Sequence, residues 1–308
     1  MTAIAPPRTA VPERDGITDV AEDIYHADRG SLSVSGAKLL LPPSCPEKFK
    51  YRLDNPPKPK KIFDEGHLAH KKVLGKGGEF MVLDPAVHGL KADGSPSDKP
   101  TATAMWKAHE AEARAAGMTP IHIDIDRNAS LMADRVLNDP DAGPLFKRGH
   151  AERALYWTDP ATRVRLRGRP DWLTLQRFGD SERLVCVDYK TSITANPAEL
   201  ERKFWQLHYY MQAAWYLDLL IALKISDNPV FLFVVQEKEP PHIVTVIEYD
   251  APAIAKGRRA NRRAIELYAQ CRETDEWPAY ARGVVSMSLP HYAFTAPTIA
   301  DLLDDEID

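Results

Sequence analysis

The sequence predicts an α/β fold in which a central mixed β-sheet is flanked by helices. Residues 152–190 carry short β-branched or aromatic segments separated by Asp-Pro and Gly-Asp turns, which is typical of consecutive strands. Residues 196–223 have the apolar spacing of one long helix, and two further strand-like segments, VFLFVVQ and HIVTVIEY, follow it. Because strands and helices follow one another in this way, we expect helices to pack on the sheet, with further helices towards the N-terminus.

The composition of the 308 residues is that of a globular protein, with 44% hydrophobic and 27% charged residues. The net charge of −4 gives no overall attraction to nucleic acid, so any DNA contact must come from local basic patches. No apolar run approaches the roughly 18 residues of a membrane helix, and the first residues lack the apolar stretch of a secretory signal. The cysteines Cys45, Cys186 and Cys271 are odd in number and widely spaced, which argues against disulfides. We therefore expect a cytoplasmic protein without membrane contact.

We expect one domain over residues 23–295, between a flexible arm over 1–22 and an acidic tail over 296–308. Residues 1–22 are rich in proline, alanine and charged residues, which disfavours a packed core. Within the domain, the polar and turn-forming residues 84–100 predict an exposed loop.

Local signals place the helices along the chain. Helix-forming residues with breakers at their ends predict N-terminal helices over 36–41, 64–74, 101–117 and 129–139. The long helix has the strongest start signal, because Asn196 can cap it, Pro197 suits its first position and Glu199 lies three residues after the cap. Its apolar residues recur at helical spacing; they are Leu200, Phe204, Leu207, Met211 and Ala214. A last helix is predicted over 251–271.

Candidate chemistry lies in the strand VCVDYKTS, residues 185–192. Side chains alternate between the faces of a strand, so Asp188 and Lys190 point the same way. Alone, this pair is weak evidence, because the same pattern at residues 201–203 lies in a helix and predicts a solvated surface.

A second carboxylate strengthens the interpretation. Asp171, in the sequence Arg-Pro-Asp, lies at the end of the preceding strand, and a hairpin through Gly179-Asp180 would bring it to Asp188. Two such carboxylates repel each other unless a cation lies between them, and hard oxygen ligands suit Mg²⁺. Lys190 could then orient a water and offset charge on a phosphate.

These residues resemble the PD-(D/E)xK nucleases, whose signature GRPDW and DYKTS reproduce letter for letter. GHLAH, residues 66–70, resembles the G-x-x-x-H helix of the RecB-like branch, and QLHYY, residues 206–210, resembles its Q-x-x-x-Y helix. Over residues 25–294 the chain is further similar to RecE-type phage exonucleases, in LSVSGAKLL, AERALYWTD and SLPHYAF. The resemblance implies a restriction-endonuclease-like core.

The resemblance also implies roles for individual residues. It makes His70, Asp171, Asp188 and Tyr189 metal ligands, for Mg²⁺ with Mn²⁺ as a substitute. Catalytic roles fall on Asp171, Asp188, Lys190, Gln206 and Tyr210, the last two sharing one helix face. Glu152 occupies the place of an acid that serves a second metal position, although an exposed strand-end carboxylate is nearly as good a reading of it.

The function that the resemblance implies is 5′→3′ resection of linear double-stranded DNA. The 3′ single strands would pass to a RecT-like annealing protein during recombination, and the enzyme would form a homo-oligomeric ring around DNA. A structure-specific or restriction-type endonuclease on the same core, or a catalytically silent DNA-binding protein, remains an alternative. CPEKF at Cys45 resembles the first ligand of an iron–sulfur cluster, but a cluster needs four thiolates and the chain has three, so none is expected.

Basic side chains near the predicted strands are candidates for DNA contact. Arg169 lies beside Asp171, where it could meet a phosphate. Arg163, Arg165 and Arg167 share one face of a strand, which either lines a DNA groove or faces water.

Overall fold

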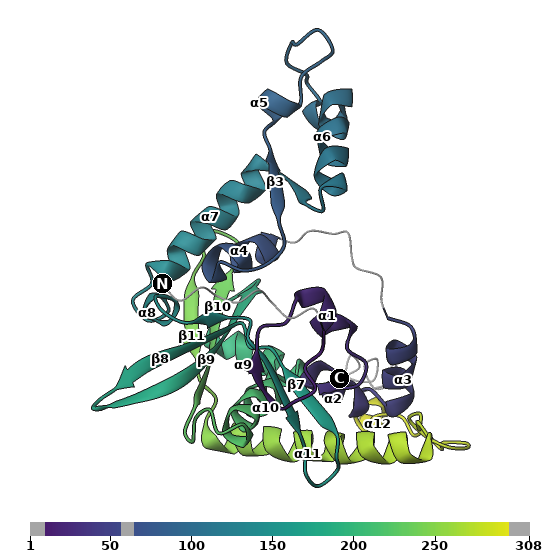
Figure 1. Ribbon diagram of the computed structural model, residues 1–308. Coiled ribbons are helices and arrows are strands. Elements are labelled where there is room, and N and C mark those ends of the chain that lie inside the picture. Colours follow the sequence, from purple (N-terminus) through teal and green to yellow (C-terminus); the bar gives the residue numbers. More distant parts are fainter. Residues whose placement is uncertain (1–9, 57–64, 296–308) are drawn as a thin grey trace, which may run out of the picture.

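A five-stranded mixed sheet forms the centre of the computed structural model, which describes residues 10–56 and 65–295 (Figure 1). The strand order is β11–β10–β9–β8–β5, with β9 and β10 parallel and the other neighbours antiparallel. The strands are β5 (His150–Ala151), β8 (Trp172–Phe178), β9 (Ser181–Ser192), β10 (Val230–Glu237) and β11 (Val244–Ile247). The predicted α/β class with a mixed sheet is confirmed.

Strands β8 and β9 form the predicted hairpin. Their pairing runs from Trp172 opposite Val187 to Phe178 opposite Ser181, so the loop is the two residues Gly179 and Asp180. Gly179 has a φ of +60°, which suits the turns that connect twisted antiparallel strands. The loop therefore fixes the register of both strands.

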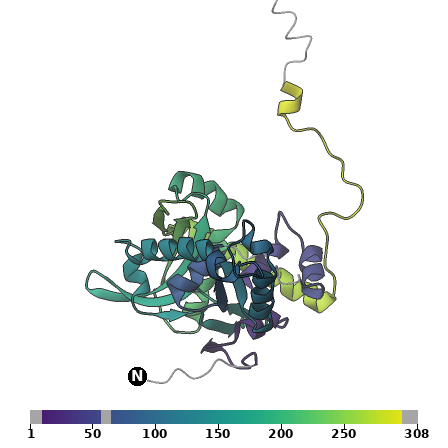
Figure 2. The ribbon, with the colours of Figure 1, turned by 90° about the horizontal axis from the view of Figure 1, so that it is seen from above.

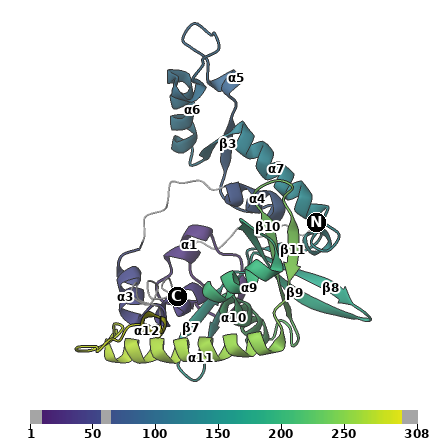
Figure 3. The same ribbon diagram turned by 180° about the vertical axis from the view of Figure 1, so that it is seen from behind.

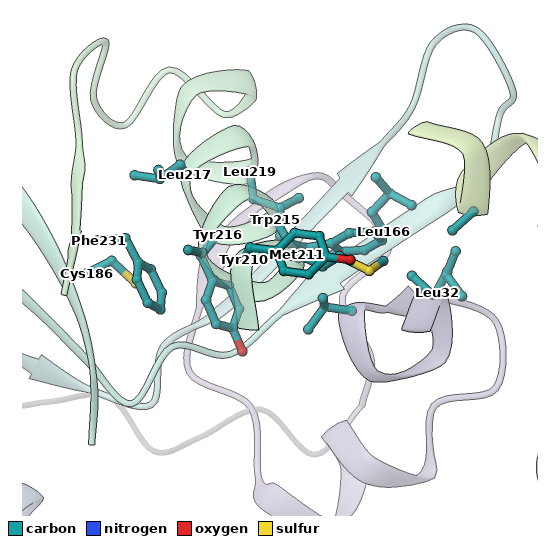
Figure 4. Packing of buried hydrophobic residues seen from close by; sticks show 14 of the residues in the cluster. Leu32, Leu166, Cys186, Tyr210, Met211, Trp215, Tyr216, Leu217, Leu219 and Phe231 are labelled. Atoms are coloured by element: carbon teal, nitrogen blue, oxygen red, sulfur yellow. The ribbon is translucent and has the colours of Figure 1, made fainter. Parts of the chain in front are cut away.

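The two faces of the sheet carry separate hydrophobic clusters because side chains alternate along each strand. Val185, Val187 and Tyr189 face one cluster with α4 (Glu65–Leu74), α7 (Ile123–Leu137) and α8 (Gly143–Phe146). Cys186, Phe231 and Phe233 face the other cluster, with α2 (Val34–Leu40), α10 (Tyr209–Ala222) and α11 (Ala251–Thr274). Figure 4 shows Tyr210, Trp215 and Tyr216 of α10 among the buried side chains of this second cluster.

The predicted long helix over 196–223 is instead two helices, α9 (Pro197–Gln206) and α10. The start is as predicted, since the Asn196 side chain accepts a hydrogen bond from the Ala198 N–H. The helix breaks at His208, whose φ of 51° lies in the left-handed region. That conformation turns the chain between the helices.

A second sheet, β1–β6–β7–β2, contains the N-terminal segment. Its strands are β1 (Gly16–Thr18), β2 (Leu32–Ser33), β6 (Ala154–Thr158) and β7 (Arg165–Gly168), and α1 (Glu22–Ala27) lies between the first two in the chain. The prediction of a flexible N-terminal segment is wrong for residues 10–22, because β1 pairs with β6. Residues 1–9 and the predicted tail over 296–308 lie outside the described residues.

Arginines of β7 hold this N-terminal segment. Arg165 donates to the backbone carbonyls of residues 12–14, and Arg167 donates to the Tyr25 carbonyl and pairs with Asp28 at 3.3 Å. These two arginines therefore do not face open water, whereas Arg163 is exposed; Arg167 also lines a cavity together with Arg169 and Asp171.

Residues 80–122 project from the body (Figures 1 and 3). We call them the arm; its elements are β3 (Phe80–Leu83), α5 (Pro85–His88), a 3₁₀ turn (Pro100–Ala102), α6 (Ala104–Ala115) and β4 (Thr119–His122). The predicted loop over 84–100 thus includes one short helix.

The remaining helices are α3 (Pro46–Asp54) and α12 (Tyr292–Thr295), and Figure 2 shows the chain after α11 running away from the body. No helix of the described part is long and apolar enough to cross a membrane.

The second sheet is tied to α11 by Asp159, which is 3% exposed. Its carboxylate accepts two hydrogen bonds from Arg262, at 3.0 and 2.9 Å, and two from Thr162. Burial by itself raises the pKa of Asp159, but the hydrogen bonds from Arg262 and Thr162 outweigh burial and lower that pKa below its ordinary value.

We expect Asp159→Asn to lower the free energy of unfolding at pH 7 by about 2 kcal/mol, since it weakens charge-assisted hydrogen bonds of a buried group. Because the pKa is lowered in the folded state, this contribution is complete above the unfolded pKa of about 4 and disappears as the pH falls through the folded value. Urea unfolding at several pH values measures it. Asp218→Asn, which breaks the half-exposed pair with Arg258, is the control and should cost less than about 1 kcal/mol; an equal cost would contradict the role of burial.

Candidate active site

Two carboxylates lie at the end of the β8–β9 hairpin. The pairing of the strands ends at Trp172 opposite Val187, so the next position sets Asp171 opposite Asp188. Residues directly opposite in antiparallel strands have Cβ atoms about 5 Å apart. The Tyr189 N–H bonds to the Asp171 carboxylate and the Asp171 charge acts on Asp188, so the structure brings the two carboxylates together.

Asp188 is 2% exposed and has two cationic or polar partners on its own face of the sheet. The Lys190 ammonium is 2.5 Å from its carboxylate, and the Gln212 amide donates to it at 2.6 Å. Burial raises the pKa of Asp188 to about 6; the Lys190 charge opposes this shift and the Asp171 charge adds to it. The carboxylate pair raises the pKa of Lys190, which outweighs the effect of burial on that ammonium. Burial and the Asp171 charge thus disfavour the ionised form of Asp188, and one lysine and one amide stabilise it.

Asp171 has different partners. Its carboxylate lies 3.3 Å from Nε2 of His70 and accepts a hydrogen bond of 2.9 Å from the Tyr189 N–H. Burial raises the pKa of Asp171, but the hydrogen bond and charge of His70, with Lys190, lower it overall. Burial likewise lowers the pKa of His70, and the carboxylates, Asp171 foremost, raise it above its ordinary value. The site thus contains His70, as the sequence predicts.

Tyr189 contributes to this site through its main chain only. Its hydroxyl points to the opposite face of the sheet and donates to Oε1 of Gln236, whose amide in turn donates to the Met132 carbonyl of α7. The Tyr189 ring lies 6.1 Å from the His70 ring. The tyrosine therefore anchors β9 beneath the carboxylates rather than offering them its hydroxyl.

Glu152 lies next to Asp171. Its N–H donates to the Asp171 carbonyl at 2.9 Å, its φ is 49°, and its carboxylate is paired with Arg169. Glu152, Arg169 and Asp171 line the same cavity of about 440 Å³. Of the two readings of Glu152, the exposed strand-end carboxylate is wrong, because its side chain is only 13% exposed.

Gln206 and Tyr210 do not share a helix face, so that prediction is wrong. Gln206 is exposed at the end of α9, and Tyr210 packs against Trp205 and bonds to His208 at the start of α10. The break at His208 separates them.

The same spacing recurs in QAAWY, residues 212–216, and this pair reaches the site. Gln212 donates to Asp188, and the Tyr216 hydroxyl donates to the Arg169 carbonyl at 3.2 Å. Both are buried on α10. The second Q-x-x-x-Y was visible in the sequence, and its position among apolar residues distinguishes it from the first.

Lys38, on α2, is a further site residue that sequence analysis missed. Its ammonium lies 5.0 Å from the centre of the Tyr209 ring, and the Lys190 ammonium lies 5.5 Å from the same ring. Burial lowers the pKa of Lys38 to about 8, and the Lys190 charge acts in the same direction. The end of the sheet that carries the two carboxylates therefore has two lysines.

The donor set fits a divalent cation. Within the described ranges, no three His, Cys, Asp or Glu side chains gather closely enough to form a metal site as they stand. Asp188 is nevertheless a buried carboxylate opposite a second one, and its pKa of about 6 reflects a charge that burial leaves poorly compensated. Mg²⁺ requires only one or two protein carboxylates, so Asp171 and Asp188, with His70 adjacent, are the residues that would hold it.

Known proteins share this fold and sequence pattern. Residues 33–288 match a family described as "PDDEXK-like domain of unknown function (DUF3799)". The fold is similar to the crystal structure of a "Putative exonuclease" from Eubacterium rectale, with a TM-score of 0.53, 10% identity, and coverage of 91% of this chain and 100% of that chain. At that identity the likeness concerns the fold alone, and no curated protein matches. The restriction-endonuclease-like core is confirmed, and because the match spans most of the sequence, the chain belongs to the PDDEXK-like family DUF3799.

Proposed function

We propose that this protein is a Mg²⁺-dependent exodeoxyribonuclease that resects linear double-stranded DNA from 5′ to 3′ and leaves 3′ single-stranded ends. The family and the fold support a nuclease. The observation that carries the proposal is the carboxylate pair Asp171 and Asp188 with Lys190 at 2.5 Å. The resemblance to RecE-type exonucleases supports the exonucleolytic mode and the polarity.

In this proposal some residues of the site bind the cation, and Lys190 stabilises the negative charge that develops on the phosphate. A bound Mg²⁺ would polarise the phosphate and lower the pKa of a water. Asp171 and Asp188 would hold the cation, with His70 beside Asp171 and Gln212 fixing the Asp188 carboxylate. Lys190 would leave its pairing with Asp188 and place its ammonium on the phosphate oxygen where negative charge builds up. Glu152 would orient Arg169 beside Asp171.

We further propose that the enzyme acts as a homo-oligomeric ring on DNA ends and delivers the 3′ strand to a RecT-like annealing protein. The resemblance to RecE-type enzymes supports both points. The net charge of −4 is compatible with this only if DNA binding is local to the site.

The first prediction separates the exonuclease from an endonuclease on the same core. With Mg²⁺, the protein should degrade linear duplex DNA and leave covalently closed circles intact, because closed circles offer no end. Label at a 5′ terminus should be released before label at a 3′ terminus. Equal cleavage of circles and linear DNA would favour the endonuclease.

The second prediction concerns Lys190. Lys190→Ala should slow digestion by about 10²–10³-fold, the usual cost of losing one group that stabilises transition-state charge. DNA binding, measured by gel shift with Ca²⁺ in place of Mg²⁺, should stay within a few-fold of the wild type. Digestion at the wild-type rate would exclude the assigned role.

The third prediction compares two glutamines of equal chemistry. Gln212→Ala should lower activity about 10- to 100-fold and raise the Mg²⁺ concentration needed for half-maximal rate, since it frees the Asp188 carboxylate. Gln206→Ala is the matched control and should leave both quantities unchanged, because Gln206 is exposed at the end of α9. If Gln206→Ala were the damaging change, the assignment of the motif to α10 would be wrong.

A further inference from the structure

Lys38 carries a partly buried charge that has no carboxylate of the described residues in contact with it. Within residues 10–56 and 65–295, its ammonium makes no hydrogen bond and no ion pair. Lys190, which lies against the Tyr209 ring as Lys38 does, is by contrast paired with Asp188. Lys38 is nevertheless only half-exposed as a residue, on a helix that packs against α10 and α11.

An ammonium in such a position is costly, because burial removes hydration and no carboxylate in the described part of the chain forms an ion pair with it; the Asp188 charge, which acts from a distance, opposes burial only in part. The face of the Tyr209 ring offsets part of that cost, but it already faces the Lys190 ammonium as well. A helix position that served packing alone would be better filled by methionine or leucine. The unpaired charge therefore points to an anion that arrives from outside the chain.

The position of the charge identifies the kind of anion. Lys38 and Lys190 both lie against the Tyr209 ring, and Lys190 pairs with Asp188, so the Lys38 ammonium lies near the carboxylate end of β9. The carboxylates Asp171 and Asp188 would repel a free anion unless a cation covers them. A polyanion whose phosphates lie several ångströms apart can place one phosphate at Lys190 and a neighbouring one at Lys38.

We propose that Lys38 binds a phosphate of the DNA strand being cut, next to the phosphodiester that Lys190 serves. The proposal rests on the proposed nuclease function and adds a contact to its substrate site. Lys38 thereby fixes the register of the strand, so that one particular phosphodiester faces the carboxylates. Charge neutralisation of this kind affects both affinity and the fraction of bound DNA in the reactive position.

The test pairs a protein change with a substrate change. Lys38→Met removes the charge at nearly constant length, and Lys38→Arg keeps it. The substrates are linear duplexes that carry an uncharged methylphosphonate at one of the phosphates around the cleaved bond. In the wild type, neutralising the phosphate that Lys38 contacts should slow single-turnover cleavage about 100-fold; in Lys38→Met the same neutralisation should cost nothing further. An equal penalty in both proteins at every position would overturn the proposal.

Two further measurements exclude a structural role. Lys38→Met should unfold at the same temperature as the wild type or higher, because it removes an uncompensated charge, whereas a structural lysine would lower the transition. DNA binding is also measured in Ca²⁺ at several salt concentrations. The slope of log K against log salt concentration should be smaller by about one released ion in Lys38→Met than in the wild type. Lys50→Met, which removes an exposed lysine paired with Asp54, is the control. It should cleave DNA at the wild-type rate, and the methylphosphonate should slow its cleavage as much as it slows that of the wild type.

The outcomes also separate this proposal from the proposed function. If the wild type digests no DNA with Mg²⁺ or Mn²⁺, the nuclease proposal fails before Lys38 is tested. If the wild type digests DNA and Lys38→Met does so equally fast, only the Lys38 contact is wrong. Recovery of cleavage in Lys38→Arg to within a few-fold of the wild type would support a role for the charge itself.

Discussion

The juxtaposition of Asp171 and Asp188 across the β8–β9 hairpin is the constraint on which the rest of the site depends. Two carboxylates on neighbouring strands, one of them almost fully buried, repel each other, and the fold answers with positive groups from every side. Lys190 comes from the same strand, His70 from α4, and the Gln212 amide from α10. One helix from each face of the sheet, α4 and α10, thus delivers a group to the same pair, and the resulting balance leaves the pKa of Asp188 at about 6.

The parts of the site that the sequence predicted correctly are those fixed by local geometry. A two-residue loop sets the register of a hairpin, and strand alternation sets the face of Asp188 and Lys190, so both follow from the order of residues. The helix with His70 is predicted from its own residues, and the family resemblance implies a metal-ligand role for this histidine; its contact with Asp171 is seen in the structure.

The parts that could not be predicted depend on tertiary packing. The break at His208 uses a left-handed conformation without the glycine or asparagine that normally marks one, and the periodicity of apolar residues continues across it. Lys38 reaches the site because α2 packs against α10 and α11, which nothing in its local sequence indicates. The N-terminal segment is held by arginines of β7 that bind main-chain carbonyls, and carbonyls have no sequence signature.

The arm has a mechanical relation to this chemistry. Helix α4, which carries His70, leads into β3 of the arm, and α7 begins directly after β4, where the His122 side chain caps it. These two helices pack against each other, and α7 also receives the Gln236 amide that is bonded to Tyr189 beneath the carboxylates. The base of the arm is therefore continuous with the helices that cover the strand of Asp188. Leu68 beside His70, Ile121 of the arm and Tyr189 of β9 belong to one hydrophobic cluster, so the foot of the arm and the support of the carboxylates are a single packed layer.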